Sequence, residues 1–133
     1  MNQAHDRNRP FVTSIAPWLS VRDAAAALDF YKAAFGAEEL YRLADDDGKP
    51  AIAELAIGEA GFWLQEDPDS SPGPEDKGSV HMILTVGDPD AVFRQAVAAG
   101  ATELAPVGEG HGWRIGRIAD PFGHHWEIGR RLV

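Results

Sequence analysis

The last stretch of the chain gathers side chains that could bind a metal ion or transfer a proton. Residues 120–129 read DPFGHHWEIG, so His124, His125 and Glu127 stand within four positions of one another. Neutral imidazole and carboxylate are ligands for Zn²⁺, Ni²⁺, Fe²⁺ or Mn²⁺, and they also act as general acids and bases. In a strand, His125 and Glu127 share one face, and His124 and Trp126 share the other. The stretch fits a metal site, one wall of a binding cleft, or a strand that closes a sheet.

Composition narrows the classes of function. The chain has no cysteine, which excludes disulfides, thiolate metal sites and a cysteine nucleophile. Its formal net charge of −9 disfavours nucleic acid and anionic lipid as partners and favours cationic ligands. No apolar run approaches the roughly 18 residues of a membrane span, and the N-terminus lacks a signal-peptide pattern. We expect a cytoplasmic protein that binds neither membrane nor nucleic acid.

The sequence contains an internal repeat. Residues 21–23 resemble residues 86–88, and residues 36–40 resemble residues 100–104, at offsets of 65 and 64. A helical pattern separates the two matches in each copy. The chain is therefore predicted to hold two copies of one module.

Each module is predicted to contain one helix. Apolar residues of the first helix recur from Ala24 to Phe35 with helical spacing, between an N-cap candidate at Asp23 and a C-terminal Gly36. The second helix begins at Asp88 and Pro89 and ends at Gly100.

Strand patterns surround both helices, one before each and three after. The predicted strands are 14–20, 37–44, 51–57 and 61–66 in the first module, and 79–86, 101–107, 113–119 and 123–129 in the second. The fold class is therefore α+β, with two βαβββ modules in one domain of residues 12–133. Module one covers 12–66, a linker rich in proline and glycine covers 67–78, module two covers 79–131, and residues 1–11 form a tail.

These modules resemble the vicinal oxygen chelate superfamily, which includes glyoxalase I, extradiol dioxygenases and the fosfomycin-resistance and bleomycin-resistance proteins. The resemblance rests on the paired modules, on PWLSV at 17–21 before the helix, and on DPFGHHW at 120–126. It is nearest to a subgroup named after a phosphonate-metabolism operon. It implies an incomplete barrel around a central cleft, a homodimer, and up to four metal ligands from the first and last strands of each module.

Carried over by position, the resemblance places two ligands in module two. His81 stands five residues before Val86, and Glu127 stands four residues beyond the turn glycine Gly123. Module one departs from the pattern, because Ala16 occupies the position equivalent to His81. Its last strand offers Gln65 or Glu66 only in a shifted register, and such a shift moves a side chain to the other face.

Three interpretations of the cleft remain open. His81, His125 and Glu127 would form a set of two histidines and one carboxylate, of the kind that binds non-haem iron. Alternatively, His81 and Glu127 form a hydrogen-bonded acid/base pair without a metal. In the third interpretation His125 is only a polar residue of the cleft wall. His124 belongs to the turn and is expected to be structural.

Other residues would line the same cleft. Trp18 occupies the face of its strand that corresponds to that of His81, where an exposed indole would stack on a flat or cationic ligand. Trp63 and Trp126 are expected in the core. Arg114 and Arg117 are three residues apart in a strand, so only one of them faces the cleft, where it would bind an anionic group of the substrate.

Two functions follow as expectations. The first is a glyoxalase/bleomycin-resistance-type protein that binds a small molecule in its cleft and acts as a metal-dependent lyase, isomerase or dioxygenase. The second is a non-catalytic protein that sequesters an antibiotic, as bleomycin-resistance proteins do. Glutathione-dependent glyoxalase I activity is not expected, because the four-ligand set is incomplete.

Overall fold

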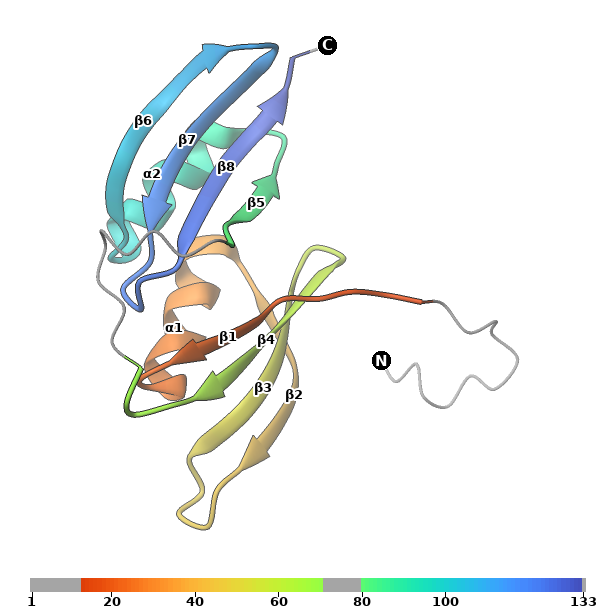
Figure 1. Ribbon diagram of the computed structural model, residues 1–133, viewed down its shortest axis with the longest axis vertical. Helices are drawn as coiled ribbons and strands as arrows, with labels where there is room; N and C mark the ends of the chain where they lie inside the picture. Colours follow the sequence, from red (N-terminus) through yellow and green to blue (C-terminus); the bar gives the residue numbers. More distant parts are fainter. Residues whose placement is uncertain (1–12, 71–79, 133) are drawn as a thin grey trace.

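The computed structural model describes residues 13–70 and 80–132, and they form two modules of similar design (Figure 1). Module one consists of β1 Trp18–Val21, α1 Ala24–Phe35, β2 Glu38–Ala44, β3 Pro50–Ile57 and β4 Ala60–Glu66. Module two consists of β5 Met82–Thr85, α2 Pro89–Ala99, β6 Thr102–Gly110, β7 Trp113–Ala119 and β8 His125–Arg131. The expected tail 1–11 and most of the expected linker 67–78 lie outside the described residues.

Both modules have the same sheet topology. The strand orders are β1-β4-β3-β2 and β5-β8-β7-β6, so the first strand of each module pairs with its last. That pairing is parallel, and the other pairs are antiparallel. In each module the helix is the crossover from the first strand, at one edge of the sheet, to the second strand, at the opposite edge. The predicted α+β class and the βαβββ order are confirmed.

The helix ends follow the sequence signals. The Asp23 and Asp88 side chains accept hydrogen bonds from the amides of Ala26 and Ala91, at 3.0 and 3.1 Å. At the end of α1, Gly36 adopts φ of 68°, the left-handed conformation that a residue without Cβ reaches at low cost. These caps fix where each helix starts and stops.

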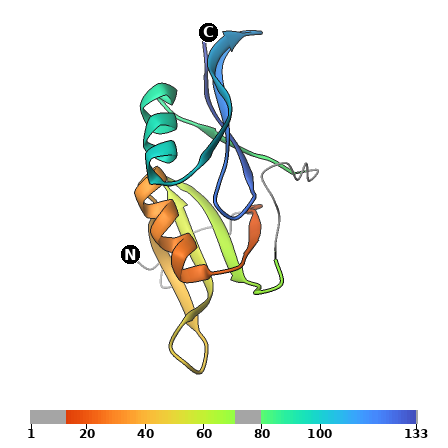
Figure 2. The ribbon, with the colours of Figure 1, turned by 90° about the vertical axis from the view of Figure 1, so that its left-hand side faces the viewer.

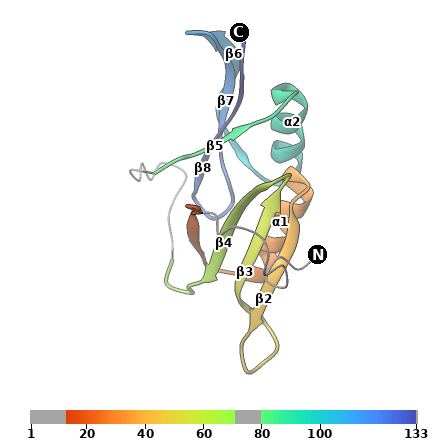
Figure 3. The same cartoon turned by 90° about the vertical axis from the view of Figure 1, so that its right-hand side faces the viewer.

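Helices α1 and α2 lie on the same side of the strands, as the two side views show (Figures 2 and 3). Successive residues of each strand therefore differ in burial, because one faces the helices and the next faces away from them. Leu19, Leu64 and Ile128 face the helices and are buried. Their neighbours Trp18, Trp63 and Glu127 face the other way, on what we call the open face of each sheet.

The core belongs to both modules at once. The Trp126 ring of β8 packs against Tyr31 and Phe35 of α1 and against Phe62 of β4, with ring centroids 5.7, 4.8 and 5.7 Å away. The helices α1 and α2 also contact each other. The modules thus pack as one unit through their helical side, whereas both open faces stay uncovered within the described chain. Neither helix of residues 13–70 and 80–132 could span a membrane.

Several strand boundaries differ from the predicted ones. β1 begins at Trp18 and β5 at Met82, because the residues before them make no regular ladder. β6 continues to Gly110, which pairs with Trp113 across a two-residue turn. In that turn His111 and Gly112 have φ of 55° and 82°, the left-handed pair typical of a tight hairpin.

Candidate functional site

Three charged or titratable side chains meet on the open face of the β5–β8 sheet. Glu127 lies on β8, which pairs with β5 on one side and with β7 on the other. Its Oε2 atom is 3.3 Å from Nδ1 of His81 and 3.7 Å from Nη2 of Arg117. All three side chains are partly exposed, at 25% for Glu127, 31% for His81 and 44% for Arg117. We call this group the polar cluster.

His125 lies beside the polar cluster but is nearly buried. It shares the face of Glu127, two residues earlier on β8, and is 7% exposed. Its ring centroid is 5.3 Å from that of His81, with the rings tilted by 39°. The two imidazoles are therefore neighbours, as expected if both histidines line one surface.

The donors fit a three-ligand metal site poorly. Within residues 13–70 and 80–132, no three His, Asp or Glu side chains are placed to hold one ion. The guanidinium of Arg117 next to Glu127 also adds positive charge where a cation would bind. His81 and Glu127 remain as two candidate ligands, and a catalytic zinc site normally has three.

Module one adds no ligand to this pair. Ala16 is exposed ahead of β1 and has no donor atom. Gln65 accepts a hydrogen bond of 2.8 Å from the indole nitrogen of Trp18. Glu66 accepts one of 3.1 Å from the amide of Ala24 at the start of α1. Both side chains thus support local structure.

A largely apolar pocket adjoins the polar cluster. Its volume is about 380 Å³. The pocket is lined by Ile83, Gly110, His111, Trp113, Ile115 and Glu127. Since Glu127 belongs to both, an apolar group in this pocket would lie next to the polar cluster. Small-molecule sites commonly combine apolar walls with a few polar groups in this way. The alternation of residues along β7 hints at this lining, but sequence alone did not single it out.

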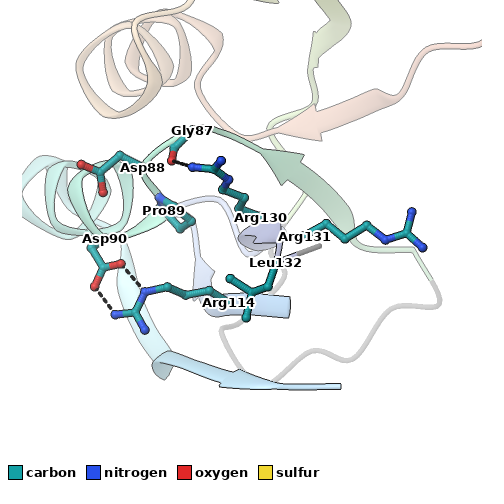
Figure 4. Close-up of a pocket in the computed structure, with 8 residues that line it drawn as sticks. All are labelled: Gly87, Asp88, Pro89, Asp90, Arg114, Arg130, Arg131 and Leu132. Atoms are coloured by element: carbon teal, nitrogen blue, oxygen red, sulfur yellow. Dashed lines mark hydrogen bonds and ion pairs between the residues drawn. The ribbon is translucent and has the colours of Figure 1, made fainter. Parts of the chain in front are cut away.

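The two candidate arginines lie on opposite faces. Arg117 reaches Glu127, whereas Arg114 points toward α2 and holds Asp90 through two hydrogen bonds of 2.6 Å (Figure 4). The hydrogen bonds from Arg114 lower the pKa of the Asp90 carboxyl, and those to Asp90 raise the pKa of Arg114. Arg114 lines a separate pocket of about 350 Å³ with Arg130, whose Nη1 donates to the Gly87 carbonyl at 3.0 Å. Of the two, Arg117 is the arginine at the polar cluster.

The tryptophans divide between the two sides of the sheets. Trp126 is 3% exposed and belongs to the core. Trp18 is 50% exposed on the open face of the β1–β4 sheet and stacks on Trp63, with centroids 6.0 Å apart. The prediction that Trp63 lies in the core is wrong, because Phe62 and Leu64 take the helix-facing positions of β4.

The DPFG turn is held by one buried carboxylate. Asp120 accepts hydrogen bonds from the amides of Phe122 and His124, both at 2.9 Å, and from the indole of Trp126 at 2.9 Å. It also accepts a hydrogen bond from the hydroxyl of Tyr31 in module one. Burial, and then the charge of Asp120, raise the pKa of Tyr31. These bonds position β8, and hence Glu127.

His124 makes a second connection between the modules. Its Nε2 atom lies 2.8 Å from the carbonyl oxygen of Ser20 in β1. This ring is therefore engaged away from the polar cluster. The sequence predicted a structural role for His124 in the turn, and the structure adds this contact between the modules.

Together, the fold and this surface define a protein of paired βαβββ modules with a pocket and titratable groups on an open sheet face. A model of the glyoxalase-like domain matches residues 18–129, and the chain belongs to that family. An uncharacterised protein of Mycobacterium bovis is 42% identical over 126 residues, which is 88% of this chain and 82% of that protein.

Solved structures agree with this assignment. TioX from a Micromonospora species is 26% identical, with a TM-score of 0.73 over 91% of this chain and 100% of that one. A glyoxalase-related enzyme from Fulvimarina pelagi is 25% identical, with a TM-score of 0.70 over 92% and 91%. A fosfomycin resistance protein from Listeria monocytogenes shares the fold at 17% identity, with a TM-score of 0.70 over 91% and 94%. All three structures share the fold of this chain.

Proposed function

We propose that the open face of the β5–β8 sheet binds a small molecule and moves a proton on it. The observation that carries this proposal is the 3.3 Å contact between His81 and Glu127 at the edge of the apolar pocket. The hydrogen bond between the Glu127 carboxylate and Nδ1 of His81 fixes the orientation of the imidazole ring. It leaves Nε2 of that ring to face a ligand. Arg117 would hold an anionic oxygen of the same ligand.

In this proposal each group has one role. His81 accepts or donates the proton, Glu127 orients His81, and the pocket around Ile83 and Trp113 takes an apolar group of the substrate. The His125 ring lies beside that of His81 and limits its movement. Lyase and isomerase reactions that begin with proton abstraction next to a carbonyl fit such a pair. We also propose that the chain belongs to the subgroup named after a phosphonate-metabolism operon. That membership does not identify a substrate.

A divalent metal is an alternative form of the same proposal. His81 and Glu127 would be its ligands from this chain, with His125 as a third only after its ring turns toward the ion. A bound Zn²⁺, Ni²⁺, Mn²⁺ or Fe²⁺ would polarise a substrate oxygen, and Fe²⁺ would permit dioxygenase chemistry. Ligands beyond these would come from a second copy of the chain or from the substrate.

Calorimetric titration of chelator-treated protein with each of the four metals separates these forms. Micromolar or tighter binding that His81→Ala and Glu127→Ala both abolish would establish the metal form. The matched control is Glu59→Ala, which removes an exposed carboxylate in the turn between β3 and β4. If no metal binds, the acid/base form stands, and the same two variants must then abolish any turnover found in a substrate screen. Turnover that survives His81→Ala would refute the assignment of the pair.

A homodimer is a further part of the proposal. It is supported by large apolar side chains that both open faces leave exposed, including Leu43 on β2 and Ile83 on β5. Burial of such side chains between two copies would complete the binding site and stabilise the pair. Size-exclusion chromatography with light scattering measures the molar mass of the protein in solution. The mass of a single chain at micromolar concentration would refute the homodimer. Cytoplasmic location is likewise proposed, and cell fractionation tests it.

Metal-independent sequestration of a drug is the second candidate function. The observation that favours it is the half-exposed Trp18 indole stacked on Trp63. A neighbour of this fold is a fosfomycin resistance protein, which makes a resistance role worth testing. Binding of an aromatic drug to chelator-treated protein should quench tryptophan fluorescence. If Trp18→Ala leaves that binding unchanged, the stacking surface is not used.

A further inference from the structure

A row of aromatic rings crosses the open face of the β1–β4 sheet. Trp18 on β1 stands beside Trp63 on β4, and Tyr41 on β2 stands across Glu54 from Trp63. Directly paired residues of neighbouring strands share a face, so all four side chains lie on one surface. The Trp18 and Trp63 rings are nearly parallel at 19°, and the Tyr41 centroid is 5.9 Å from that of Trp63. We call these three rings the aromatic row.

The aromatic row is accessible and its first ring is held in place. Trp18 and Tyr41 are 50% and 47% exposed. The indole nitrogen of Trp18 donates to Gln65 at 2.8 Å, which fixes the orientation of the ring. A rigid aromatic surface loses little conformational entropy when a flat molecule stacks on it.

A carboxylate lies within the row. Glu54 sits on β3 between the positions of Trp63 and Tyr41. A neighbouring position on β4 is Gly61, which has no side chain to cover the carboxylate. A Cβ placed on Gly61 would lie 3.9 Å from Oε2 of Glu54. Among the ion pairs of the described residues, none involves Glu54. Its negative charge is therefore available to a ligand.

Rings and carboxylate favour the same kind of ligand. The face of an indole or phenol ring attracts a cation, and an unpaired carboxylate adds direct attraction at short range. The chain's net charge of −9 raises the local concentration of cations and lowers that of anions. A flat ligand with a fixed positive charge would use the stacking surface and the carboxylate together.

We infer that Trp18, Trp63, Tyr41 and Glu54 form a binding surface for planar aromatic cations. The inference rests on the sequestering function proposed above and names its ligand class. It requires no metal and none of the residues of the polar cluster. Trp18 and Trp63 supply the stacking surface, Tyr41 closes one end, and Glu54 selects for positive charge.

A pair of probes with the same ring system tests the inference. 10-Methylacridinium carries a permanent charge, whereas acridine is neutral at pH 7.5. Each is titrated into the chelator-treated full chain by calorimetry and by quenching of tryptophan fluorescence. The cation should bind about ten-fold more tightly than the neutral probe, the factor that about 1.4 kcal/mol of cation–π and charge attraction gives.

Variants then separate stacking from charge. Trp18→Ala should weaken both probes at least five-fold, and Glu54→Gln should weaken only the cation and remove its advantage. Glu103→Gln is the matched control, because it removes one negative charge from β6 of the other sheet and should change neither affinity. Thermal unfolding confirms that each variant is folded, and Trp18→Leu replaces Trp18→Ala if the latter is not.

The outcomes distinguish the inference from the function on which it rests. If both probes bind equally well and Glu54→Gln changes neither, the surface stacks aromatic molecules but does not select cations, and the inference fails alone. If neither probe binds, both the inference and sequestration at Trp18 are refuted. The acid/base proposal for His81 and Glu127 is untouched by either result, because the metal titrations and the substrate screen test it separately.

Discussion

Tyr31 of α1 and Asp120 of the DPFG turn stand 89 positions apart in the chain, and a buried hydrogen bond joins them. Tyr31 is fully buried, and Asp120 is 3% exposed. The same carboxylate oxygen accepts a hydrogen bond from the indole nitrogen of Trp126. One side chain of module two therefore organises the turn, the last strand and a helix of module one.

The first prediction concerns stability at alkaline pH. The pKa of Tyr31 lies above its ordinary value because the ring is buried and faces the charge of Asp120. The unfolded chain loses the tyrosine proton near pH 10 while the native protein keeps it, so unfolding becomes easier as pH rises above about 10. The contribution of Tyr31 is thus present below that pH and is lost above it.

The variant Tyr31→Phe should reveal this pH-dependent contribution to stability. At pH 7 the variant should be less stable by about 1–2 kcal/mol, because the hydroxyl no longer bonds Asp120. The difference from wild type should shrink as pH rises above 10. Urea unfolding at several pH values measures it, with Tyr41→Phe as an exposed control that should follow the wild-type curve. A difference independent of pH would contradict the prediction.

The second prediction concerns the Asp120 carboxylate. Asp120→Asn keeps the shape, but it replaces one acceptor oxygen by an NH₂ group that faces donors. We expect a loss of about 3 kcal/mol or more in the free energy of unfolding, since the carboxylate accepts four hydrogen bonds. Asp46→Asn, which changes an exposed carboxylate in the turn between β2 and β3, is the control. A loss below 1 kcal/mol would show that solvent or neighbours replace these bonds.

The third prediction concerns a close contact between α2 and β7. A Cβ placed on Gly116 would come within 2.8 Å of the Phe93 ring and 2.9 Å of Val107. Gly116→Ala should therefore destabilise the protein by about 1–3 kcal/mol through overpacking. At Gly108 of β6 a Cβ meets nothing within 4 Å, so Gly108→Ala is the matched control and should be nearly neutral. Equal melting temperatures for the two variants would contradict the close packing.

The fourth prediction separates the two arginines. Arg114 makes two short contacts to Asp90, yet both side chains are about one-third exposed. Exposed ion pairs contribute little to stability, so Arg114→Ala should leave the melting temperature nearly unchanged. It should also leave ligand binding at the polar cluster unchanged. Arg117→Ala should weaken an anionic ligand there about ten-fold, the effect of losing one charge-assisted hydrogen bond of about 1.4 kcal/mol. The reverse pattern would place the ligand beside α2.

The sequence predicted the fold well because its strongest signals are local and repeated. Helix periodicity and the Asp23, Gly36, Asp88 and Gly100 caps set both helices, and the repeat predicted two equal modules. The spacing of Arg114 and Arg117 predicted opposite faces, but it could not tell which face holds the site. That choice depends on which side the helices cover.

The errors have a similar cause. Period-two alternation in β4 offers Phe62 and Trp63 as equally apolar candidates for the core, and tertiary packing against Tyr31 and Trp126 decides for Phe62. The role of Asp120 was missed because its partner Tyr31 is distant in sequence. Turn chemistry alone explained an aspartate at that position, so nothing local indicated the contact between modules.

The separation of the two sides of each sheet has a consequence for how such a chain can diverge. The joint through Tyr31, Asp120 and Trp126 lies on the helical side, and the exposed residues lie on the other. Mutations that exchange exposed side chains, such as Trp18 or Ile83, cost little stability because no core contact is lost. New ligand preferences can therefore accumulate by drift on a scaffold that stays intact. A fold organised in this way lets binding specificity evolve faster than architecture.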